Sequence, residues 1–225
     1  MSERQAPLGL FGGTFDPVHF GHLRLAEEAH EQLGLGEVVW IPAGQPPLRD
    51  APATPAVDRA AMVSQAIADH PGFSLDSTEV DSAAPSYTVL TLERWRERLG
   101  PERSLVLLLG ADAFARLESW HRWRELFALA HIAVATRPGH SIKVGAGDTA
   151  LDRELVARQA APATLVASAA SANTPAGHIV PFAIRPLDIS ATVIRNELGS
   201  GCSARYLAPD AVLDYIYRHS LYRHA

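Results

Sequence analysis

The chain has 225 residues, a length that suits one large domain with a substantial hydrophobic core. Twenty basic residues stand against 25 acidic ones, and a net charge of −5 without any basic run argues against a nucleic-acid-binding surface. The single cysteine, Cys202, excludes an internal disulfide, and neither an apolar stretch of membrane-spanning length nor a signal-peptide pattern occurs. We therefore expect a cytoplasmic protein that binds neither nucleic acid nor membranes.

Short apolar segments alternate with amphipathic ones along the chain, which is the pattern of a parallel α/β sheet. The predicted strands are residues 7–11, 38–41, 73–80, 105–109, 132–135 and 179–184, and the predicted helices are residues 22–33, 57–68, 86–99, 120–130, 151–160, 190–198 and 209–219. Residues 105–109 are apolar throughout and should form a buried central strand. The predicted fold class is α/β, a Rossmann-like doubly wound parallel sheet with helices on both faces.

The chain has no internal repeat and no clean linker, so residues 1–225 are predicted to form a single domain. Residues 43–56 are rich in proline and should form a loop. Residues 139–177 include an Ala/Ser-rich stretch and are expected to be a variable insertion, a loop around one helix. Residues 190–225 should supply the closing helices.

Residues 12–22 read GGTFDPVHFGH and follow the first predicted strand. The dipeptide Asp16-Pro17 resembles a helix start, with Asp as N-cap and Pro at the first helical position. His19 and His22 would then share one face at the helix N-terminus, and Gly21 would keep that face open to close approach. A Gly-rich turn, a helix N-terminus and two histidines together predict a site for phosphate groups.

Two other interpretations of these histidines are weaker. They could be ordinary surface residues beside a glycine turn, or they could be half of a zinc site. Zinc requires three or four ligands, however, and Cys202 lies far along the chain. We therefore expect no metal ligands in this segment.

Residues 189–195, ISATVIR, form a second candidate phosphate site. Ser190 fits a helix N-cap, so the helix would point free N–H groups and a positive dipole end outward. Arg195 follows about one turn later, and its guanidinium suits bidentate contact with a phosphate. Taken alone, the segment favours an ordinary capped helix with a solvated arginine.

Both segments resemble the signatures of the nucleotidylyltransferase superfamily, GTFDPxHxGH and ISxTxxR. Further segments between residues 8 and 222 are similar to bacterial nicotinate-nucleotide adenylyltransferases, namely IPAGQPP at 41–47, PSYTVLTL at 85–92, LLLGADAF at 107–114, SWHRW at 119–123 and RPG at 137–139. One position departs from that family, because Leu48 stands where the family commonly has histidine.

This resemblance implies which residues hold the substrates. The implied catalytic residues, which contact the triphosphate, are His19, His22 and Arg195. The implied ATP-binding residues are Gly12, Gly13, Thr14, Phe15, Gly110, Ser190 and Thr192. The implied nicotinate-nucleotide-binding residues are Tyr87, Thr88, Asp112, Trp120, His121 and Arg137, with Arg49 as an additional candidate.

The same resemblance implies how the acceptor is held. Trp120 would stack on the pyridine ring, and Asp112 would contact the ribose. Main-chain N–H groups near Thr88 and His121 would receive the nicotinate carboxylate, which agrees with the preference of a helix N-terminus for an anion. Trp95 and Trp123 lie at apolar spacing in predicted helices and are expected to be core residues.

The implied reaction is transfer of AMP from ATP to the 5′-phosphate of nicotinate mononucleotide, with release of pyrophosphate, as a step of NAD biosynthesis. The partners would be ATP and nicotinate mononucleotide, and the protein would be a monomer or a small homo-oligomer. Mg²⁺ would arrive on the ATP phosphates, with little or no ligation by the protein.

Three alternatives remain open. The first is the same chemistry on another acceptor, such as nicotinamide mononucleotide or phosphopantetheine. The second is a non-catalytic nucleotide sensor. The third is a dinucleotide-dependent dehydrogenase, because residues 145–150, GAGDTA, match a dinucleotide fingerprint, but the acidic residue expected about 20 positions later is missing.

Overall fold

In the computed structural model, which describes residues 6–47, 51–136, 142, 149–171 and 174–223, the strands form one parallel sheet in the order β3-β2-β1-β4-β5-β6. The strands are β1 (Leu8–Gly13), β2 (Glu37–Pro42), β3 (Phe73–Leu75), β4 (Leu105–Gly110), β5 (His131–Thr136) and β6 (Ile179–Ala183). The order reverses between β1 and β4, which is where open α/β sheets bind ligands, beyond the carboxyl ends of the strands.

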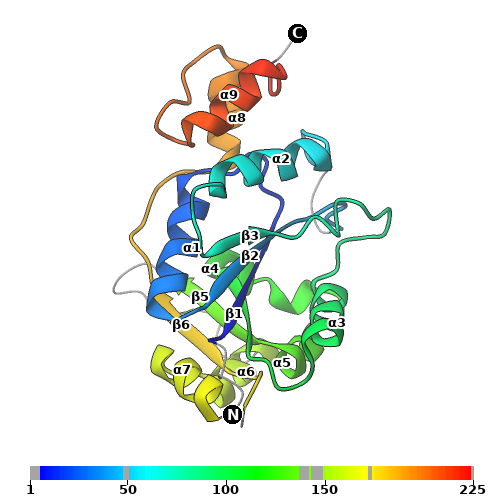
Figure 1. Ribbon diagram of the computed structural model, residues 1–225, viewed down its shortest axis with the longest axis vertical. Helices are drawn as coiled ribbons and strands as arrows, with labels where there is room; N and C mark the ends of the chain where they lie inside the picture. The colour runs from blue at the N-terminus through cyan, green and yellow to red at the C-terminus, as the bar shows by residue number, and fades with distance from the viewer. Residues whose placement is uncertain (1–5, 48–50, 137–141, 143–148, 172–173, 224–225) are drawn as a thin grey trace.

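The helices cover both faces of this sheet, as Figure 1 shows, with α8 and α9 above it in that view and α6 and α7 below. They are α1 (Phe20–Gln32), α2 (Ala56–Ile67), α3 (Thr88–Leu99), α4 (Ala111–Phe114), α5 (Leu126–Leu129), α6 (Ala150–Arg158), α7 (Pro162–Ser171), α8 (Ala191–Gly199) and α9 (Asp210–Arg218). The predicted Rossmann-like fold class is confirmed. No helix among the described residues combines the length and the apolar character that crossing a bilayer would require.

Two hydrophobic cores lie on opposite faces of the sheet, because side chains alternate along each strand. In β4, Leu105, Leu107 and Leu109 enter one core, while Val106 and Leu108 enter the other. Helices α1, α2, α8 and α9 contribute to the core that contains Val106, and helices α3, α5 and α6 contribute to the opposite core. All of β4 up to Leu109 is therefore buried, as its apolar sequence predicts.

Three predicted elements differ from the structure. The strand predicted at 73–80 ends at Leu75, because the Asp76 side chain accepts a hydrogen bond from the Thr78 N–H at 2.9 Å and turns the chain. The helix predicted at 120–130 starts late, since Arg122 has a φ of 53° and only a 3₁₀ turn (Trp123–Glu125) precedes α5. The insertion predicted to hold one helix contains two, α6 and α7.

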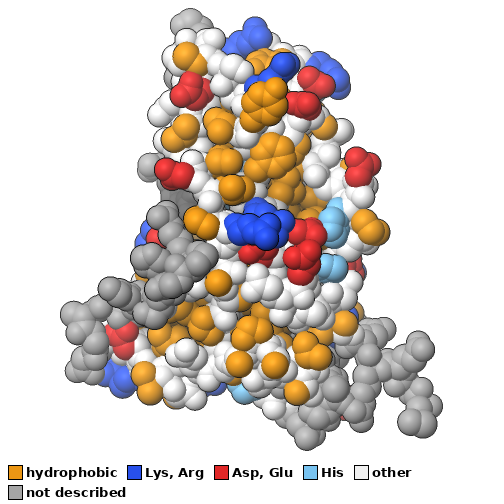
Figure 2. Space-filling view, turned by 90° about the vertical axis from the view of Figure 1, so that its left-hand side faces the viewer, with side chains coloured by type: hydrophobic (Ala, Val, Ile, Leu, Met, Phe, Trp, Pro, Cys, Tyr) orange, Lys and Arg blue, Asp and Glu red, His pale blue; other side chains and the backbone are white. Residues whose placement is uncertain are grey.

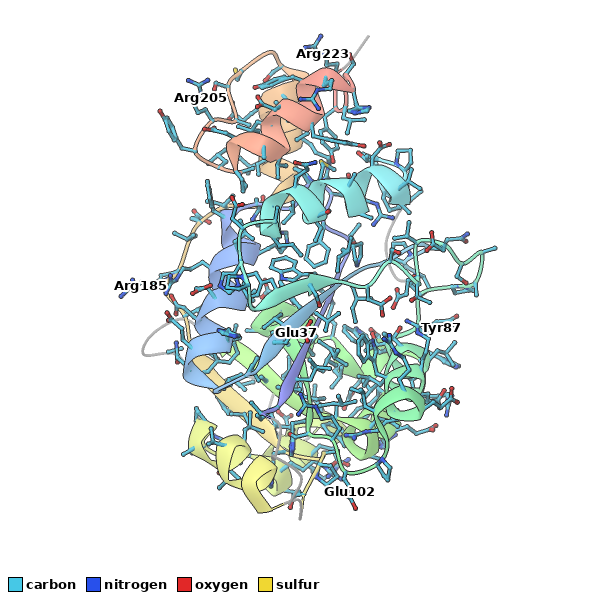
Figure 3. The ribbon with its side chains drawn as sticks, in the orientation of Figure 1. Glu37, Tyr87, Glu102, Arg185, Arg205 and Arg223 are labelled. Carbon is cyan, nitrogen blue, oxygen red and sulfur yellow. The ribbon has the colours of Figure 1, made fainter. Side chains whose placement is uncertain are left out.

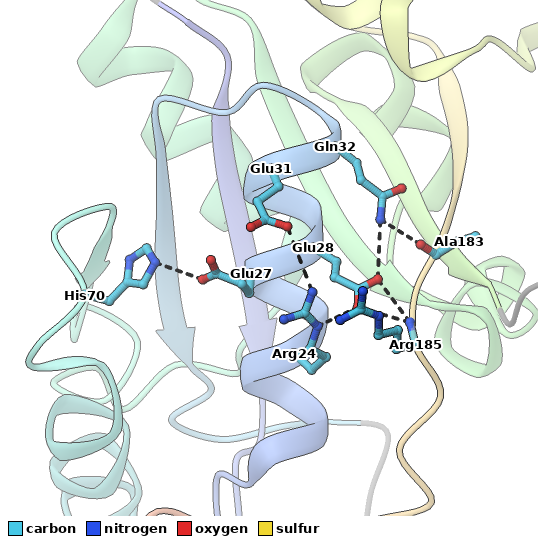
Figure 4. A network of polar contacts seen from close by, with 8 residues as sticks. All are labelled: Arg24, Glu27, Glu28, Glu31, Gln32, His70, Ala183 and Arg185. Atoms are coloured by element: carbon cyan, nitrogen blue, oxygen red, sulfur yellow. Dashed lines mark hydrogen bonds and ion pairs between the residues drawn. The ribbon is translucent and has the colours of Figure 1, made fainter.

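A buried carboxylate on α1 fixes the crossover from β6 to α8 (Figure 4). Both oxygens of Glu28 accept from the Arg185 N–H, at 3.2 and 3.0 Å, and Oε1 also accepts from Arg24 Nε at 2.5 Å. The Gln32 amide donates to the Ala183 carbonyl at 2.8 Å. Figure 2 shows this side of the molecule, where charged side chains of both signs meet between two largely apolar areas. The polar contacts attach the crossover to α1 and so help to set where α8 begins.

Candidate active site

A cavity of about 330 Å³ opens at the carboxyl ends of β1 and β4, where the strand order reverses. Its volume lies in the range of small-molecule sites. Apolar side chains of the sheet and α3 line its interior, and Figure 3 marks Tyr87 at the start of α3. The polar and main-chain part of its lining includes Gly12, Gly13, Thr14, Ser86, Tyr87, Thr88, Gly110, Arg116, Ser119, Trp120 and His121.

The two histidines of the segment 12–22 lie together at the start of α1. Their ring centroids are 3.8 Å apart and their planes differ by 30°, so the predicted proximity is confirmed. The predicted helix start at Asp16-Pro17 is wrong, because α1 begins at Phe20 and His19 itself is the N-cap. The Nδ1 atom of His19 accepts the hydrogen bond from the Gly21 N–H at 3.1 Å.

Gly21 is needed for this cap because the His19 ring lies directly over it. A Cβ atom at position 21 would stand 3.0 Å from two atoms of that ring. The absence of a Cβ atom at Gly21 therefore lets the His19 ring pack closely over the main chain, and a larger residue there would require the ring to shift.

His19 is a neutral hydrogen-bond donor in this arrangement. Because Nδ1 accepts from a main-chain N–H, the ring proton sits on Nε2. Burial lowers the pKa of His19 to about 4, so the ring stays uncharged at neutral pH. His19 can offer an anion a hydrogen bond but not a positive charge.

Asp16 joins three distant parts of the chain, and this is why it does not cap α1. One carboxylate oxygen accepts from the Tyr222 hydroxyl at 2.7 Å, and the other accepts from the Ala53 N–H at 2.8 Å. The Asp16 carbonyl accepts from Arg195 Nη1, also at 2.7 Å. The side chain is buried, so these bonds replace its hydration.

The second predicted phosphate segment reaches the first through Arg195. Ser190 is the N-cap of α8, as predicted, and its hydroxyl accepts from the Val193 N–H at 3.2 Å. Arg195 Nη2 contacts the Thr192 hydroxyl at 3.2 Å, while Nη1 is bonded to the Asp16 carbonyl. The two predicted phosphate segments therefore meet at Asp16 and Arg195. Gly12, Gly13 and Thr14 of the first segment line the cavity, whereas His19, His22, Ser190, Thr192 and Arg195 are not among its lining residues.

A buried arginine on α2 braces the loops that follow β1 and β2. The Arg59 guanidinium donates to the carbonyls of Thr14, Gly44 and Thr54 at 2.7, 3.1 and 3.1 Å. Only 1% of its surface is exposed. Because its donors reach both loops, Arg59 fixes their separation at the mouth of the cavity.

The residues expected at the nicotinate end lie around the other part of the cavity. The ring centroids of Tyr87 and His121 are 4.5 Å apart with the planes tilted by 33°, and Trp120 is half-buried in the wall. The helix predicted at 86–99 begins at Thr88, and the Ser86 hydroxyl accepts a hydrogen bond from the Gln45 N–H at 3.1 Å. The start of α3 thus faces the cavity without a side-chain cap.

Some expected site residues lie elsewhere. Phe15 is buried against Phe11 and Trp40 and does not line the cavity. Asp112 is exposed on α4 and does not line the cavity. Arg49, Leu48 and Arg137 lie outside the described residues. The predicted core positions of Trp95 and Trp123 are confirmed.

Comparison with known proteins gives the family. A cytidylyltransferase-like family model matches residues 10–197. A protein of Dechloromonas aromatica, named "Probable nicotinate-nucleotide adenylyltransferase", is 58% identical and covers all of both chains. A protein of the same name from Laribacter hongkongensis is 48% identical over 96% of this chain and 94% of its own. The chain belongs to the nicotinate-nucleotide adenylyltransferase family.

Membership in this adenylyltransferase family makes the chain an enzyme of the nucleotidyltransferase class. The solved structure of Plasmodium falciparum nicotinic acid mononucleotide adenylyltransferase complexed with NaAD superposes with a TM-score of 0.70. The two chains are 16% identical, and the match covers 97% of this chain and 98% of the other, so the fold is shared.

Three residues that line the cavity or hold the segment 12–22 were not predicted from the sequence. Arg116 lines the cavity, and Glu79 lines it while accepting a hydrogen bond from the Thr91 hydroxyl. Tyr222 reaches Asp16 from the far end of the chain. The sequence gives no indication of Glu79 and Tyr222 because their roles depend on tertiary contacts and not on local spacing.

We predict that His19 does not titrate near neutral pH in the folded enzyme. Nitrogen NMR of histidine-labelled protein should show the Nε2–H tautomer with no change between about pH 5.5 and 8, whereas the ring in the urea-unfolded chain should titrate near about 6.5. The unfolded state then binds a proton that the folded state does not, so this group's contribution to stability is lost as the pH falls from 6.5 toward about 4.

The variant His19→Asn is the control for this titration, because asparagine can also cap α1. It should reduce the dependence of the free energy of unfolding on pH in that window. His131 has its pKa lowered to about 4 as well, chiefly by burial, so part of the dependence should persist. An inflection for His19 near pH 6.5 would contradict the assignment.

Proposed function

We propose that the protein transfers AMP from ATP to the 5′-phosphate of nicotinate mononucleotide, forming nicotinate adenine dinucleotide and pyrophosphate. One observation carries the proposal: Arg195 Nη1 donates to the Asp16 carbonyl at 2.7 Å and so joins the two predicted phosphate-binding segments, the first of which lines the cavity through Gly12, Gly13 and Thr14. The name of the 58% identical relative supports the choice of acceptor.

The chemistry requires no general base. The nucleophile is a phosphate oxygen of the acceptor, and a phosphate monoester with a second pKa of about 6 is mostly dianionic at neutral pH. This oxygen attacks the α-phosphorus of ATP, and the bond to pyrophosphate breaks as the new bond forms. The protein has to align the two nucleotides and stabilise the charge that develops.

The phosphate-facing groups suit that task. His19 offers the Nε2–H bond of a neutral imidazole, and His22 lies against it. The N-terminus of α8 adds a positive dipole end and the first N–H groups of a helix, which have no acceptor within it. At α1 the Phe20 N–H donates to the Leu207 carbonyl and the Gly21 N–H donates to His19 Nδ1, so this helix adds only its dipole end. Arg195 supplies the formal positive charge, close to where the α-phosphate and the departing pyrophosphate would lie.

The acceptor ring would lie at the start of α3. Thr88 and Val89 are the first helical residues, and N–H groups at such positions have no acceptor within a helix. A carboxylate matches these donors with two acceptor oxygens. Trp120 and His121 supply the aromatic side of the same cavity, and Arg116 gives its rim a positive charge.

Mg²⁺ is expected to enter on the phosphates of ATP, where it would offset part of their charge. The residues present fit that expectation, because the one carboxylate of the segment 12–22, Asp16, already accepts hydrogen bonds on both oxygens. Asp16 therefore binds other parts of the protein, and His19, His22 and Arg195 would contact the phosphates.

The acceptor preference tests the proposed function. Nicotinate mononucleotide should be used over its amide by at least about 10²-fold in kcat/KM, because a carboxamide loses one or two charge-assisted hydrogen bonds of about 1.5–3 kcal/mol each. The two compounds should compete in one assay with ATP. Equal use of both would contradict the carboxylate site, and no turnover with either would favour a nucleotide sensor.

The stacking role of Trp120 is tested by truncation. Trp120→Ala should weaken binding of nicotinate mononucleotide by about 1–3 kcal/mol, the usual loss of a base–aromatic stack, and should leave ATP binding unchanged. Calorimetric titration measures both affinities, and Trp120→Phe, which keeps an aromatic face, is the control. Equal loss of both ligands with a lower melting temperature would show that Trp120 is a packing residue.

A further inference from the structure

The last described residues of the chain return to the loop between β1 and α1. The chain ends beside α9, where Figure 3 labels Arg223. The neighbouring Tyr222 points its hydroxyl at Asp16 and donates to Oδ1 at 2.7 Å. The closing segment thereby reaches a residue 206 positions earlier, inside the segment that carries both site histidines.

The Tyr222 hydroxyl is hydrogen-bonded and stays protonated. Burial raises the pKa of its hydroxyl above the ordinary value, and the bond to Asp16 adds to that rise, while Thr54 and Arg195 act in the opposite direction. The hydroxyl therefore stays protonated and remains a donor to the Asp16 carboxylate. Thr54 is itself buried, and its carbonyl accepts from Arg59.

Asp16 relays this contact to Arg195. Its carboxylate is held by Tyr222 on one oxygen and by the Ala53 N–H on the other, so the orientation of the whole residue is fixed. Its carbonyl in turn accepts a hydrogen bond from Arg195 Nη1. If Asp16 turned, that carbonyl would turn with it, and the guanidinium would lose the bond that sets its direction.

We propose that Tyr222 is a positioning residue for nucleotidyl transfer, which holds Asp16 so that its carbonyl keeps Arg195 directed at the phosphates. The inference rests on the proposed function, since Arg195 is assigned there to the reacting phosphates. Tyr222 touches neither nucleotide in this account and acts only through Asp16.

The chain offers a matched control in Tyr215. Its hydroxyl donates to the carboxylate Oδ1 of Asp58 at 2.8 Å and joins α9 to α2. Tyr222→Phe and Tyr215→Phe therefore each remove one hydroxyl-to-carboxylate bond that attaches the closing segment. Only Tyr222 is bonded to the segment 12–22, so the two variants separate positioning from general stability.

The experiment compares the two variants in steady-state turnover of ATP and nicotinate mononucleotide. Tyr222→Phe should lower kcat by about tenfold or more with a KM for ATP within about threefold, because a displaced group costs transition-state contacts. Tyr215→Phe should keep kcat within about twofold, and both should lower the melting temperature to a similar degree. A Tyr222→Phe enzyme with wild-type kcat, or an equal loss of kcat in both variants, would overturn the proposal.

A double-mutant cycle keeps the inference testable if Tyr222→Phe is also unstable. In an Arg195→Ala background, Tyr222→Phe should cause less than about a twofold further loss of kcat, since residues that act through one contact are not additive. A full additional loss in that background would show that Tyr222 acts independently of Arg195. An inactive wild-type enzyme would instead refute the proposed function and is recognisable as a separate failure.

Discussion

The buried hydrogen bonds of Asp16 and Arg59 are the constraint on which the site depends. Residues 14–19 connect β1 to α1 without regular secondary structure, so no helix or strand ladder fixes their peptide groups. Arg59 donates a hydrogen bond to the Thr14 carbonyl, and Arg195 donates one to the Asp16 carbonyl. The Tyr222 hydroxyl and the Ala53 N–H donate to the Asp16 carboxylate. A buried charge is costly unless it is hydrogen-bonded, so a displaced loop would leave several polar groups unsatisfied at once.

This constraint favours a single conformation of the loop. Donors that are already aimed at a developing charge need no rearrangement when the reaction occurs, which is the most effective form of electrostatic stabilisation. The neutral state of His19 fits the same account. Its Nδ1 atom is committed to the Gly21 N–H, so the tautomer and the ring direction are set by the fold and not by the ligand.

The sequence predicts the sheet well because its strands are buried on both faces and read as apolar runs, as in residues 105–109. It also predicts the proximity of His19 and His22, since helical spacing alone puts them on one face. The helix α7 could have been predicted, because Pro162 at its first position and the alanines that follow are ordinary helix signals.

The errors have a common physical origin. Asp16 and Ser86 both have the side chains of helix caps, but each is bonded to a distant segment, Tyr222 and Ala53 for the first and Gln45 for the second. Local rules of capping describe what a side chain does when nothing else competes for it. Here tertiary partners compete, and a single sequence does not contain the distance between residues 16 and 222.

A structure of the enzyme with a non-hydrolysable ATP analogue and nicotinate mononucleotide tests the central claim most directly. The account predicts that phosphate oxygens lie within about 2.7–3.2 Å of His19 Nε2 and of the Arg195 guanidinium. Residues 14–19 should keep their present conformation to within about 1 Å, as pre-organised sites do. The account would be contradicted if the loop had lost its hydrogen bonds to Arg59 and to the present partners of Asp16. It would also be contradicted if the phosphates lay beyond hydrogen-bonding distance of His19 and Arg195.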